Sequence, residues 1–425
     1  MFAQRGLKMI KTFKEHEKFY FSKEGSASIL LCFFFCKQQL LYFINMLGLL
    51  VIRKNTPYDT LLVYVVYYIS LALFIYYCIR RCRVRTIWLL IAAGILVGGT
   101  VIVCRENVQY INQYGSRIFT EFLFPIIVLQ QIENKEHIIN SIRVGTFISG
   151  ICMLIGYPIN EIVLGNHTAA DGYMVLTYMI LIGFAGFSYY GITENKKCYV
   201  AIAIVLFLEM IMAGSRGPLI CGFVITITAL VRTYKNISKK NIASIVLIII
   251  VLTIIATNIN GILLFLGKIA SANNINARVL DLIQKGHFIN NESTEIRSDV
   301  FIYLNGKILE NPLGYGFLGD RGVLSNINAS YPHNLFYELV LQFGWIIGGL
   351  LGVEITYNII RNIISSDFYG SYTASIDILV AIAFVKLMMT GSYVWESYFA
   401  MLVYLLINGK NVGGVYKKNE NFMGG

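Results

Sequence analysis

Lys268-Ile-Ala-Ser-Ala-Asn-Asn-Ile-Asn opens the longest mainly hydrophilic interval of the chain. The interval passes through Asn311-Pro-Leu-Gly-Tyr-Gly316 and ends with Tyr331-Pro-His-Asn334. Apolar runs flank it on both sides, because Ile242–Leu266 precedes it and Leu335–Ile360 follows it. A polar interval between two runs of this length predicts a large loop carried by two membrane-spanning helices.

The composition argues against a soluble protein. Apolar residues make up 56% of the 425 residues, charged residues only 14%, and the mean hydropathy is +0.63, whereas soluble domains have roughly a quarter charged residues. Because a spanning helix needs about 20 apolar residues, the chain has room for about 12 of them. We therefore expect an all-α, polytopic integral membrane protein in which residues 1–425 form a single membrane domain. The expected spans are Ser26–Ile52, Asp59–Ile79, Thr86–Cys104, Arg117–Gln131, Val144–Leu164, Gly172–Ile192, Cys198–Ala213, Leu219–Val231, Ile242–Leu266, Leu335–Ile360, Ala374–Met389 and Tyr398–Ile407.

Basic residues give the expected orientation. They form short clusters between the apolar runs rather than a patch on one folded domain, so the net charge of +11 does not indicate nucleic-acid binding. Such clusters mark cytoplasmic loops, and Arg80-Arg81-Cys82-Arg83-Val84-Arg85 is the strongest of them. Alternation from this anchor places the basic N-terminal segment, residues 1–25, in the cytoplasm. It places the large extracytoplasmic loop, residues 267–334, outside.

The large loop contains one expected helix. Ser293-Thr-Glu295 has the residues of a helix start, and Asn311-Pro312 ends the pattern. Between them, apolar residues recur four apart at Ile296, Val300, Leu304 and Ile308. We expect an amphipathic helix that lies on the outer membrane surface. A helix packed onto its own loop is the alternative.

Arginines gather on the expected outer side, where the positive-inside rule predicts few of them. They are Arg105, Arg117, Arg216, Arg278, Arg297 and Arg321. The planar guanidinium binds a phosphate at two points, which a lysine does not do. The group therefore predicts an anionic lipid head group such as a diphosphate. For Arg105 and Arg117, a local ion pair with Glu106 or Glu121 is the competing interpretation.

Arg216 differs from the other arginines in its surroundings. It lies in Gly214-Ser-Arg-Gly-Pro218, a turn between two apolar runs. Glycines let a ligand approach the backbone closely. Pro218 suits the first turn of a helix, whose free amide groups attract anions. Glu209, the nearest acid in the sequence, is an alternative partner for Arg216.

His333 is the candidate for proton transfer. It lies beside a span with polar neighbours, at the end of the loop that holds several of the arginines. Imidazole exchanges a proton near neutral pH. A purely structural histidine is the competing interpretation. No His, Cys or carboxylate side chains have metal-ligand spacing, so we expect no catalytic metal and no cofactor.

Three motifs follow one another in the second half of the chain. Gly214-Ser-Arg-Gly-Pro-Leu219 comes first and Asn311-Pro-Leu-Gly-Tyr-Gly316 second. Pro332-His-Asn-Leu-Phe-Tyr337, leading to Gly344-Trp-Ile-Ile-Gly348, is the third. In this order, around the largest loop, they resemble the bacterial O-antigen polymerase and ligase family, which includes the Wzy-type polysaccharide polymerases. The resemblance covers Leu206 to Gly352, about a third of the chain.

The resemblance implies a multi-pass enzyme of the bacterial cytoplasmic (inner) membrane. Such an enzyme transfers a glycan from an undecaprenyl-diphosphate donor on the outer face without a metal. By this resemblance Arg216 and His333 are catalytic: Arg216 holds the diphosphate, and His333 activates or orients the acceptor hydroxyl. The implied substrate-binding residues are Arg297, Arg278, Asn334 and Tyr315. The implied partners are the lipid-linked oligosaccharide, the lipid bilayer, a flippase and a chain-length regulator.

Three functions stay open at this point. A polymerase that joins lipid-linked repeat units into capsule or into the O-antigen of lipopolysaccharide is the one we favour. A ligase would move the finished glycan to lipid A core or another acceptor. A transporter without chemistry predicts charges near the bilayer midplane. The charges deep in the expected spans are instead scattered, at Lys37, Glu209, Glu354 and Lys386.

Overall fold

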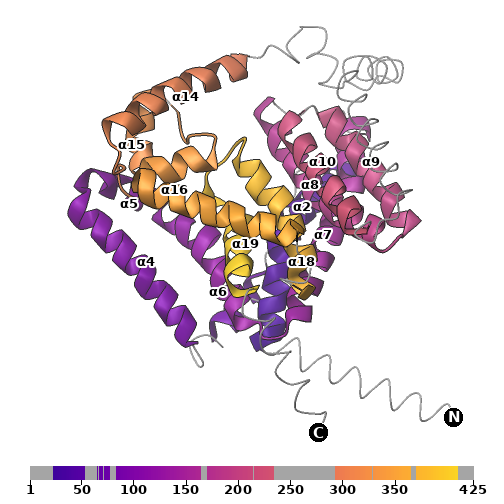
Figure 1. Ribbon diagram of the computed structural model, residues 1–425. Helices are drawn as coiled ribbons and strands as arrows, with labels where there is room; N and C mark the ends of the chain where they lie inside the picture. The colour runs from indigo at the N-terminus through magenta and orange to yellow at the C-terminus, as the bar shows by residue number, and fades with distance from the viewer. Residues whose placement is uncertain are drawn as a thin grey trace, which may run out of the picture.

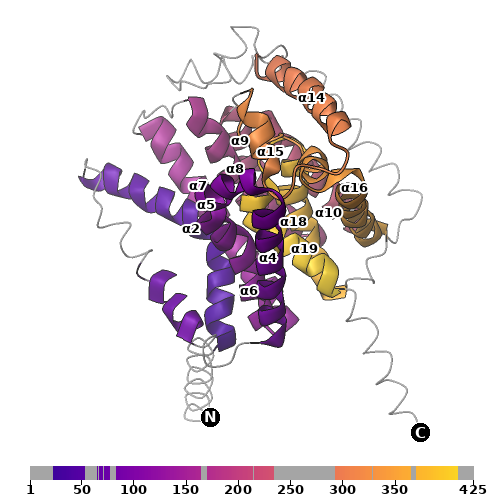
Figure 2. The same ribbon diagram turned by 90° about the vertical axis from the view of Figure 1, so that its left-hand side faces the viewer.

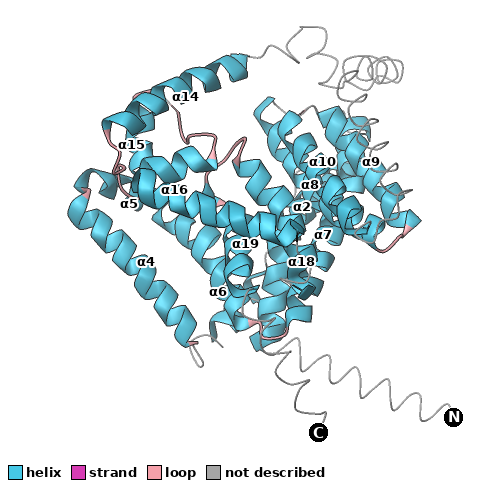
Figure 3. Ribbon diagram, in the orientation of Figure 1, coloured by secondary structure: helices cyan, strands magenta, loops and turns pink. Residues whose placement is uncertain are grey.

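The computed structural model describes residues 23–52, 65, 67–69, 71–76, 83–163, 170–213, 215–233, 292–327, 329–364 and 370–409. Every regular element within these residues is a helix, as Figure 3 shows. The prediction of an all-α protein is therefore confirmed for this part of the chain. The basic segment before residue 23 and the first part of the large loop, residues 267–291, lie outside the described residues.

The elements fall on either side of the gap after residue 233. Before it lie α2 (Lys23–Ile52), α4 (Val84–Val103), η1 (Arg105–Asn107), α5 (Val108–Ile118), η2 (Phe119–Leu123), α6 (Phe124–Gln131), α7 (Lys135–Pro158), η3 (Ile159–Val163), α8 (Ala170–Thr193), α9 (Lys197–Ala213) and α10 (Arg216–Thr233). After it lie α14 (Glu292–Glu310), α15 (Gly319–Ser325), α16 (Leu335–Ile364), η4 (Gly370–Tyr372), α18 (Thr373–Leu379), η5 (Val380–Val385), η6 (Tyr393–Trp395) and α19 (Ser397–Asn408).

Six of the described helices are long and apolar enough to cross a membrane. They are Lys23–Leu50, Val84–Val103, Lys135–Glu161, Met174–Thr193, Arg216–Thr233 and Leu335–Ile364. The apolar helix α9 has 17 residues, and Gly370–Val385 and Ser397–Asn408 are also shorter than a full span. These helices are those of a multi-pass membrane protein. The expected number of about 12 spans is not confirmed, and the expected span Ile242–Leu266 lies outside the described residues.

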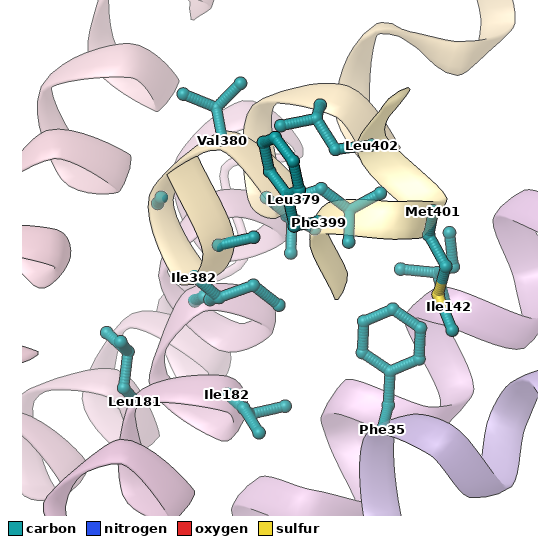
Figure 4. Close-up of a cluster of buried hydrophobic side chains, with 14 of the residues drawn as sticks. Phe35, Ile142, Leu181, Ile182, Leu379, Val380, Ile382, Phe399, Met401 and Leu402 are labelled. Atoms are coloured by element: carbon teal, nitrogen blue, oxygen red, sulfur yellow. The ribbon is translucent and has the colours of Figure 1, made fainter. Parts of the chain in front are cut away.

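One helix bundle forms the core of the described structure. Within it, α2 packs on α7, α7 on α8, and α8 on both α9 and α10, while α18, η5 and α19 complete the bundle (Figures 1 and 2). Figure 4 shows how Phe35 of α2, Ile142 of α7 and Met401 of α19 meet in its interior. All three side chains are fully buried. Side chains from distant parts of the chain therefore hold the helices in one arrangement.

Small residues allow α7 and α8 to touch along their backbones. A Cβ atom on Gly183 would lie 2.2 Å from the Cα atom of Gly150. A Cβ atom on Gly150 would in turn lie 2.6 Å from the ring of Phe187. Association of helices in a membrane depends on such close packing, because lipid tails are as apolar as the side chains they replace. This contact fixes the centre of the bundle that positions the site described below.

Ion pairs gather at one end of the bundle. Arg83 pairs with Glu133 just before α7, and Arg232 at the end of α10 pairs with Asp377 of α18 at 2.7 Å. Lys135, the first residue of α7, lies over the ring of Tyr372 just before α18, 5.8 Å from its centroid, so these pairs belong to the same end. The sequence analysis assigned the cluster that contains Arg83 to the cytoplasmic side. The opposite end carries α5, α14 and α15 (Figure 1).

The helix α16 is broken in the middle and folds back on itself. Gly344 has φ 76° and ψ 175°, which no helix contains. A Cβ atom on Gly352 would lie 2.7 Å from the ring of Phe336, although a straight helix would separate these residues by about 24 Å. The expected span Leu335–Ile360 is therefore not one straight helix. Its second half, residues 345–364, has the length of a span, roughly 30 Å, and the first half packs beside it (Figure 1).

The Asn311-Pro-Leu-Gly-Tyr-Gly316 motif holds this break in place. In an unbroken helix the Trp345 N–H would donate to the Leu341 carbonyl. Here the Trp345 N–H donates to the Pro312 carbonyl (2.9 Å), and the Leu341 carbonyl accepts from the Tyr315 N–H (2.7 Å). The motif thus pairs both backbone groups that the break releases, which an apolar environment requires. Gly314, at φ +86°, makes room, because a Cβ atom there would lie 2.4 Å from the Gly344 nitrogen.

Gly344→Val is expected to lower the stability of the protein by at least about 2 kcal/mol. The positive φ alone costs a β-branched residue roughly 1–3 kcal/mol. A Cβ atom would also lie 2.6 Å from the Leu313 and Pro312 backbone. Gly349→Ala in the same helix is the matched control, since nothing lies within 4 Å of its Cβ position. The measurement is the apparent melting temperature in detergent. Equal melting temperatures for the two variants would contradict the role of the break.

The predicted helix of the large loop is α14, and its apolar stripe is buried. Val300, Leu304 and Ile308 are at most 6% exposed and pack against α15 and the first half of α16. The side chain of Ile296 lies outside the described residues. The stripe that was expected to face the membrane surface instead faces the rest of the loop. The alternative, a helix packed onto its own loop, therefore describes α14.

Candidate active site

Arg216 is the first residue of α10, and its side chain is half-buried. The backbone there is tightly packed, because a Cβ atom on Gly217 would lie 2.6 Å from the hydroxyl of Tyr178 and 3.9 Å from the Cε atom of Met389. The start of α10 thus touches both α8 and the residues that follow η5. Glu209, the alternative partner, is buried in α9, and its carboxylate has no hydrogen bond to any residue the structure describes. The alternative interpretation, a pair of Arg216 with Glu209, is therefore not found among the described residues.

His333 lies at the end of the large loop in a left-handed conformation, with φ 58°. Such a backbone is costly for a residue other than glycine, and it is often found where a side chain has a function. The imidazole packs on the ring of Tyr331 with 4.4 Å between ring centroids. Pro332 between them is buried. The loop therefore fixes the position of the imidazole immediately before α16 begins.

Asn334 is the N-cap of α16. Its Oδ1 atom accepts from the backbone N–H groups of Phe336 (2.9 Å) and Tyr337 (3.4 Å), which have no partner within the helix. Its Nδ2 atom donates to the Met388 carbonyl at 3.4 Å. The side chain that was assigned to substrate binding therefore joins the His333 loop to the residues after η5. Its role in binding remains a prediction.

The residues between η5 and α19, Lys386 to Glu396, bring the two predicted catalytic regions together; we call them the 386–396 segment. Met389 lies beside Gly217 at the start of α10, and the Met388 carbonyl accepts from Asn334 beside His333. Lys386 pairs with Glu396 and lies over the ring of Tyr178, 5.1 Å from its centroid. Gly217, beside Arg216, and Asn334, beside His333, thus both contact the 386–396 segment, although Arg216 and His333 are far apart in sequence.

A buried ionic network supports this segment from the side of the large loop. The guanidinium of Arg321 lies 2.8 Å from a carboxylate oxygen of Asp320 and 2.8 Å from one of Glu338. It also donates to the hydroxyl of Ser392 at 2.6 Å, while Glu338 accepts from the Tyr393 N–H at 3.1 Å. All three charged side chains are at most 3% exposed. Burial raises the pKa of Asp320, and the positive charge of Arg321 opposes that rise.

Aromatic side chains and two cations surround Trp395. Arg321 lies on its ring at 4.5 Å and Arg117 at 5.0 Å from the centroid. Tyr114 and Tyr331 pack against it with centroid distances of 5.3 and 6.5 Å. The expected local pair of Arg117 with Glu121 is not found among the described residues, and Glu121 instead accepts from the hydroxyl of Ser397.

The remaining predicted binding residues lie elsewhere or outside the described part. The hydroxyl of Tyr315 donates to the Lys307 carbonyl at 3.0 Å, so this tyrosine ties α14 to the motif at the break of α16. The backbone of Arg297 belongs to α14, but its side chain lies outside the described residues, as does all of Arg278. The assignment of these three residues to substrate binding stays a prediction.

Sequence reasoning missed Lys386, Glu396 and Trp395 as members of the site. Lys386 was counted as one of several scattered charges, because its partner lies ten residues away across an irregular turn. The signal was present in Thr390-Gly-Ser392, a polar interruption before Trp395 in an otherwise apolar stretch. Within the described residues, no group of three or more His, Cys, Asp or Glu side chains is placed to hold a metal ion.

Comparison with known proteins identifies one related family. A family model described as O-antigen ligase matches residues 200–352, which include Arg216, the motif at Asn311–Gly316 and His333. No curated protein and no solved structure matches the chain. The matched region runs from α9 through the large loop to the second half of α16. It therefore covers both sides of the candidate site, while the 386–396 segment lies beyond it.

Proposed function

We propose that this chain, whose residues 200–352 match a family model described as O-antigen ligase, is a polysaccharide polymerase of the bacterial cytoplasmic membrane. It transfers a glycan from an undecaprenyl-diphosphate donor to a lipid-linked repeat unit, on the outer face, in the synthesis of O-antigen or capsule. The observation that supports this most directly is the convergence of Arg216 and the His333 loop on the 386–396 segment. Arg216, a cation for the diphosphate leaving group, and His333, a base for the acceptor hydroxyl, then belong to one site.

Arg216 binds the donor diphosphate in this proposal. Its guanidinium offers two parallel donors to phosphate oxygens. As the first residue of α10, it also lies where the free backbone N–H groups and the helix dipole attract anions. Arg297 and Arg278, from the large loop, complete the neutralisation of the two phosphates. Asn334 and Tyr315 hold the loop that carries His333.

The transfer is a direct displacement. The acceptor hydroxyl oxygen attacks the anomeric carbon of the donor while the bond from that carbon to the diphosphate oxygen breaks. The electron pair of that bond stays on the diphosphate, whose growing charge the arginines stabilise. The hydroxyl proton passes to the imidazole of His333. Attack on the side opposite the leaving group inverts the configuration of the anomeric carbon, and no metal takes part.

The distribution of basic residues supports the placement of the candidate site on the outer side of the membrane. Arg83 and Arg232 lie at the end of the bundle opposite α14 and α15, as far as the described residues extend. Basic clusters such as the one that ends at Arg85 mark the cytoplasmic side. The site at the start of α10 and the end of the large loop then faces outward, where lipid-linked repeat units are assembled into polymer.

A ligase is the second candidate, because the matching family model is described as O-antigen ligase. The two functions predict different products in cells. Loss of a polymerase leaves a single repeat unit on the final acceptor, whereas loss of a ligase leaves long chains on the carrier lipid. A gel of the surface glycans from cells without the protein therefore separates the two. Unchanged chain lengths in both fractions would exclude both functions.

Arg216→Ala is expected to give the same gel as loss of the whole protein. Removing a guanidinium from a bound phosphate costs about 1.5–3 kcal/mol of binding. A further loss arises when the same group stabilises charge in the transition state, so the rate should fall by about 10²- to 10³-fold. Arg232→Ala would destabilise the opposite end of the bundle, so Arg361→Ala, at a partly exposed side chain, is the better control. Wild-type chain lengths from Arg216→Ala would remove this residue from the mechanism.

A further inference from the structure

The side chains around Trp395 have no role in the displacement itself. Tyr114, Arg117, Tyr331 and Trp395, here called the Trp395 cluster, come from α5, the end of the large loop and η6. Trp395 and both tyrosines are partly exposed, and Arg117 is exposed. Partly exposed aromatic rings gathered beside the candidate site offer apolar faces that a ligand can cover. Their arrangement therefore points to a ligand that covers them.

The two cations on Trp395 differ in how their charge is balanced. Arg321 is buried and lies within 2.8 Å of carboxylate oxygens of Asp320 and Glu338. Arg117 lies on the same indole at 5.0 Å, and among the described residues no carboxylate pairs with it. The indole holds this guanidinium in place by a cation–π contact and leaves its five N–H donors for another group. Within the described part of the chain, Arg117 is thus a positioned and exposed positive charge without a paired carboxylate.

The cluster is adjacent to the proposed general base. Tyr331 packs against Trp395 with 6.5 Å between centroids and against His333 with 4.4 Å. Its hydroxyl lies 3.2 Å from the hydroxyl of Thr390 in the 386–396 segment. Three contacts through two rings, Trp395 and Tyr331, therefore connect Arg117 to the imidazole. A sugar on these rings would present one of its hydroxyls to His333.

We propose that the Trp395 cluster binds the acceptor saccharide and that Arg117 selects an acceptor that carries a negative charge. This proposal rests on the proposed function. The C–H groups of a sugar ring carry partial positive charge and pack on the negative faces of indole and phenol rings. A carboxylate on the same sugar, as in a uronic acid, accepts two parallel hydrogen bonds from the guanidinium. The substrate class is therefore an acidic, lipid-linked oligosaccharide.

The test begins with direct binding, because binding does not require turnover. The chain has three tryptophans, and Trp88 and Trp345 are 65% and 55% exposed. Replacing both by phenylalanine leaves Trp395 as the single emitter in the full-length protein. This variant, in phosphatidylcholine nanodiscs, is titrated with a galacturonate hexamer and with the neutral galactose hexamer. We expect a saturable change in Trp395 fluorescence with the galacturonate hexamer, at a concentration about tenfold lower than with the neutral one.

Arg117→Ala and Arg117→Lys in this background should remove that tenfold preference, because a lysine does not reproduce the two-point contact. Arg105→Ala, which removes another exposed arginine of the same side, is the matched control and should keep the preference. No fluorescence change with either hexamer, or equal binding of both, would overturn the proposal. If phosphatidylglycerol nanodiscs give the same change without sugar, Arg117 binds lipid head groups and the proposal is also wrong.

Kinetics separate this inference from the proposed function. In the transfer reaction with purified protein, Arg117→Ala should raise KM for an acidic acceptor about tenfold and leave KM for the donor unchanged. An increase in the donor KM alone would place Arg117 on the diphosphate and contradict the acceptor role. If the wild-type protein transfers nothing from an undecaprenyl-diphosphate donor, the proposed function fails. The fluorescence titration still decides whether the cluster prefers an acidic sugar.

Discussion

His333→Ala is expected to lower the rate of glycan transfer by about 10²- to 10⁴-fold, the usual contribution of a positioned general base. The imidazole is held by its packing on Tyr331 and by the loop that ends at the cap residue Asn334. Replacing it leaves the acceptor hydroxyl without a group that takes its proton. The measurement is the initial rate of transfer between purified undecaprenyl-diphosphate repeat units in detergent.

The left-handed backbone at residue 333 provides a sharper variant. Asparagine adopts a positive φ more readily than other residues with a side chain, so His333→Asn keeps the loop conformation and removes the base. We expect His333→Asn to melt within a few degrees of the wild type and to be as inactive as His333→Ala. His137→Ala, in α7, should keep full activity. A His333→Asn variant with more than about a tenth of the wild-type rate would exclude proton transfer by this residue.

The regions around Arg216 and His333 could be proposed as parts of a site from the sequence, because each has a local signature. A glycine–arginine–glycine–proline turn and a proline–histidine–asparagine loop end are visible in a few residues each, around Arg216 and His333. Their approach to one another depends on the 386–396 segment, which carries no such signature. The ion pair between Lys386 and Glu396 forms across an irregular turn. No helical or strand periodicity relates Lys386 to Glu396, so the sequence alone did not predict this ion pair.

The break in α16 could not be predicted from hydropathy, because an average over an apolar run does not report a backbone dihedral angle. Leu335–Ile360 has the length and composition of a span, and one residue at φ 76° divides it. The sequence signal for the break was the set of glycines at 344, 348 and 352. Gly348 and Gly352 let the second half of α16 pack on the first half. The motif around Gly314 has a structural role at this break, whereas the resemblance implied substrate binding by Tyr315 of the same motif.

The network around Arg321 was not predicted either, because Asp320 and Glu338 lie on different helices. The sequence analysis counted Arg321 among the arginines of a phosphate site. Its guanidinium is instead surrounded by two carboxylates and by Ser392 in the protein interior. A buried arginine whose charge is balanced by two carboxylates positions neighbouring side chains. Through Ser392 and Trp395 it fixes the 386–396 segment, and through Glu338 it fixes the start of α16 directly after His333.

Arg321→Ala is therefore expected to destabilise the protein by about 3–5 kcal/mol, the cost of leaving a buried charge without its partner. Two carboxylates and one guanidinium share this site, so the substitution leaves two negative charges uncompensated. The measurement is the apparent melting temperature in detergent. Lys307→Ala is the control, since its ion pair with Glu310 is partly exposed and screened by solvent, so its loss should leave the melting temperature almost unchanged.

The loss of stability in Arg321→Ala should depend on pH in a definite direction. Burial holds the pKa of Asp320 above its ordinary value, and removal of the guanidinium raises it further. The folded protein then binds a proton that the unfolded chain releases, so stability falls as pH rises through this range. We expect a larger deficit relative to the wild type at about pH 8 than at about pH 5.

Changing Asp320→Asn and Glu338→Gln together with Arg321→Met should restore most of the stability, because no uncompensated charge is left. A deficit that is the same at both pH values would mean that lost packing on Trp395, rather than the uncompensated charges of the two buried carboxylates, determines the stability of this network.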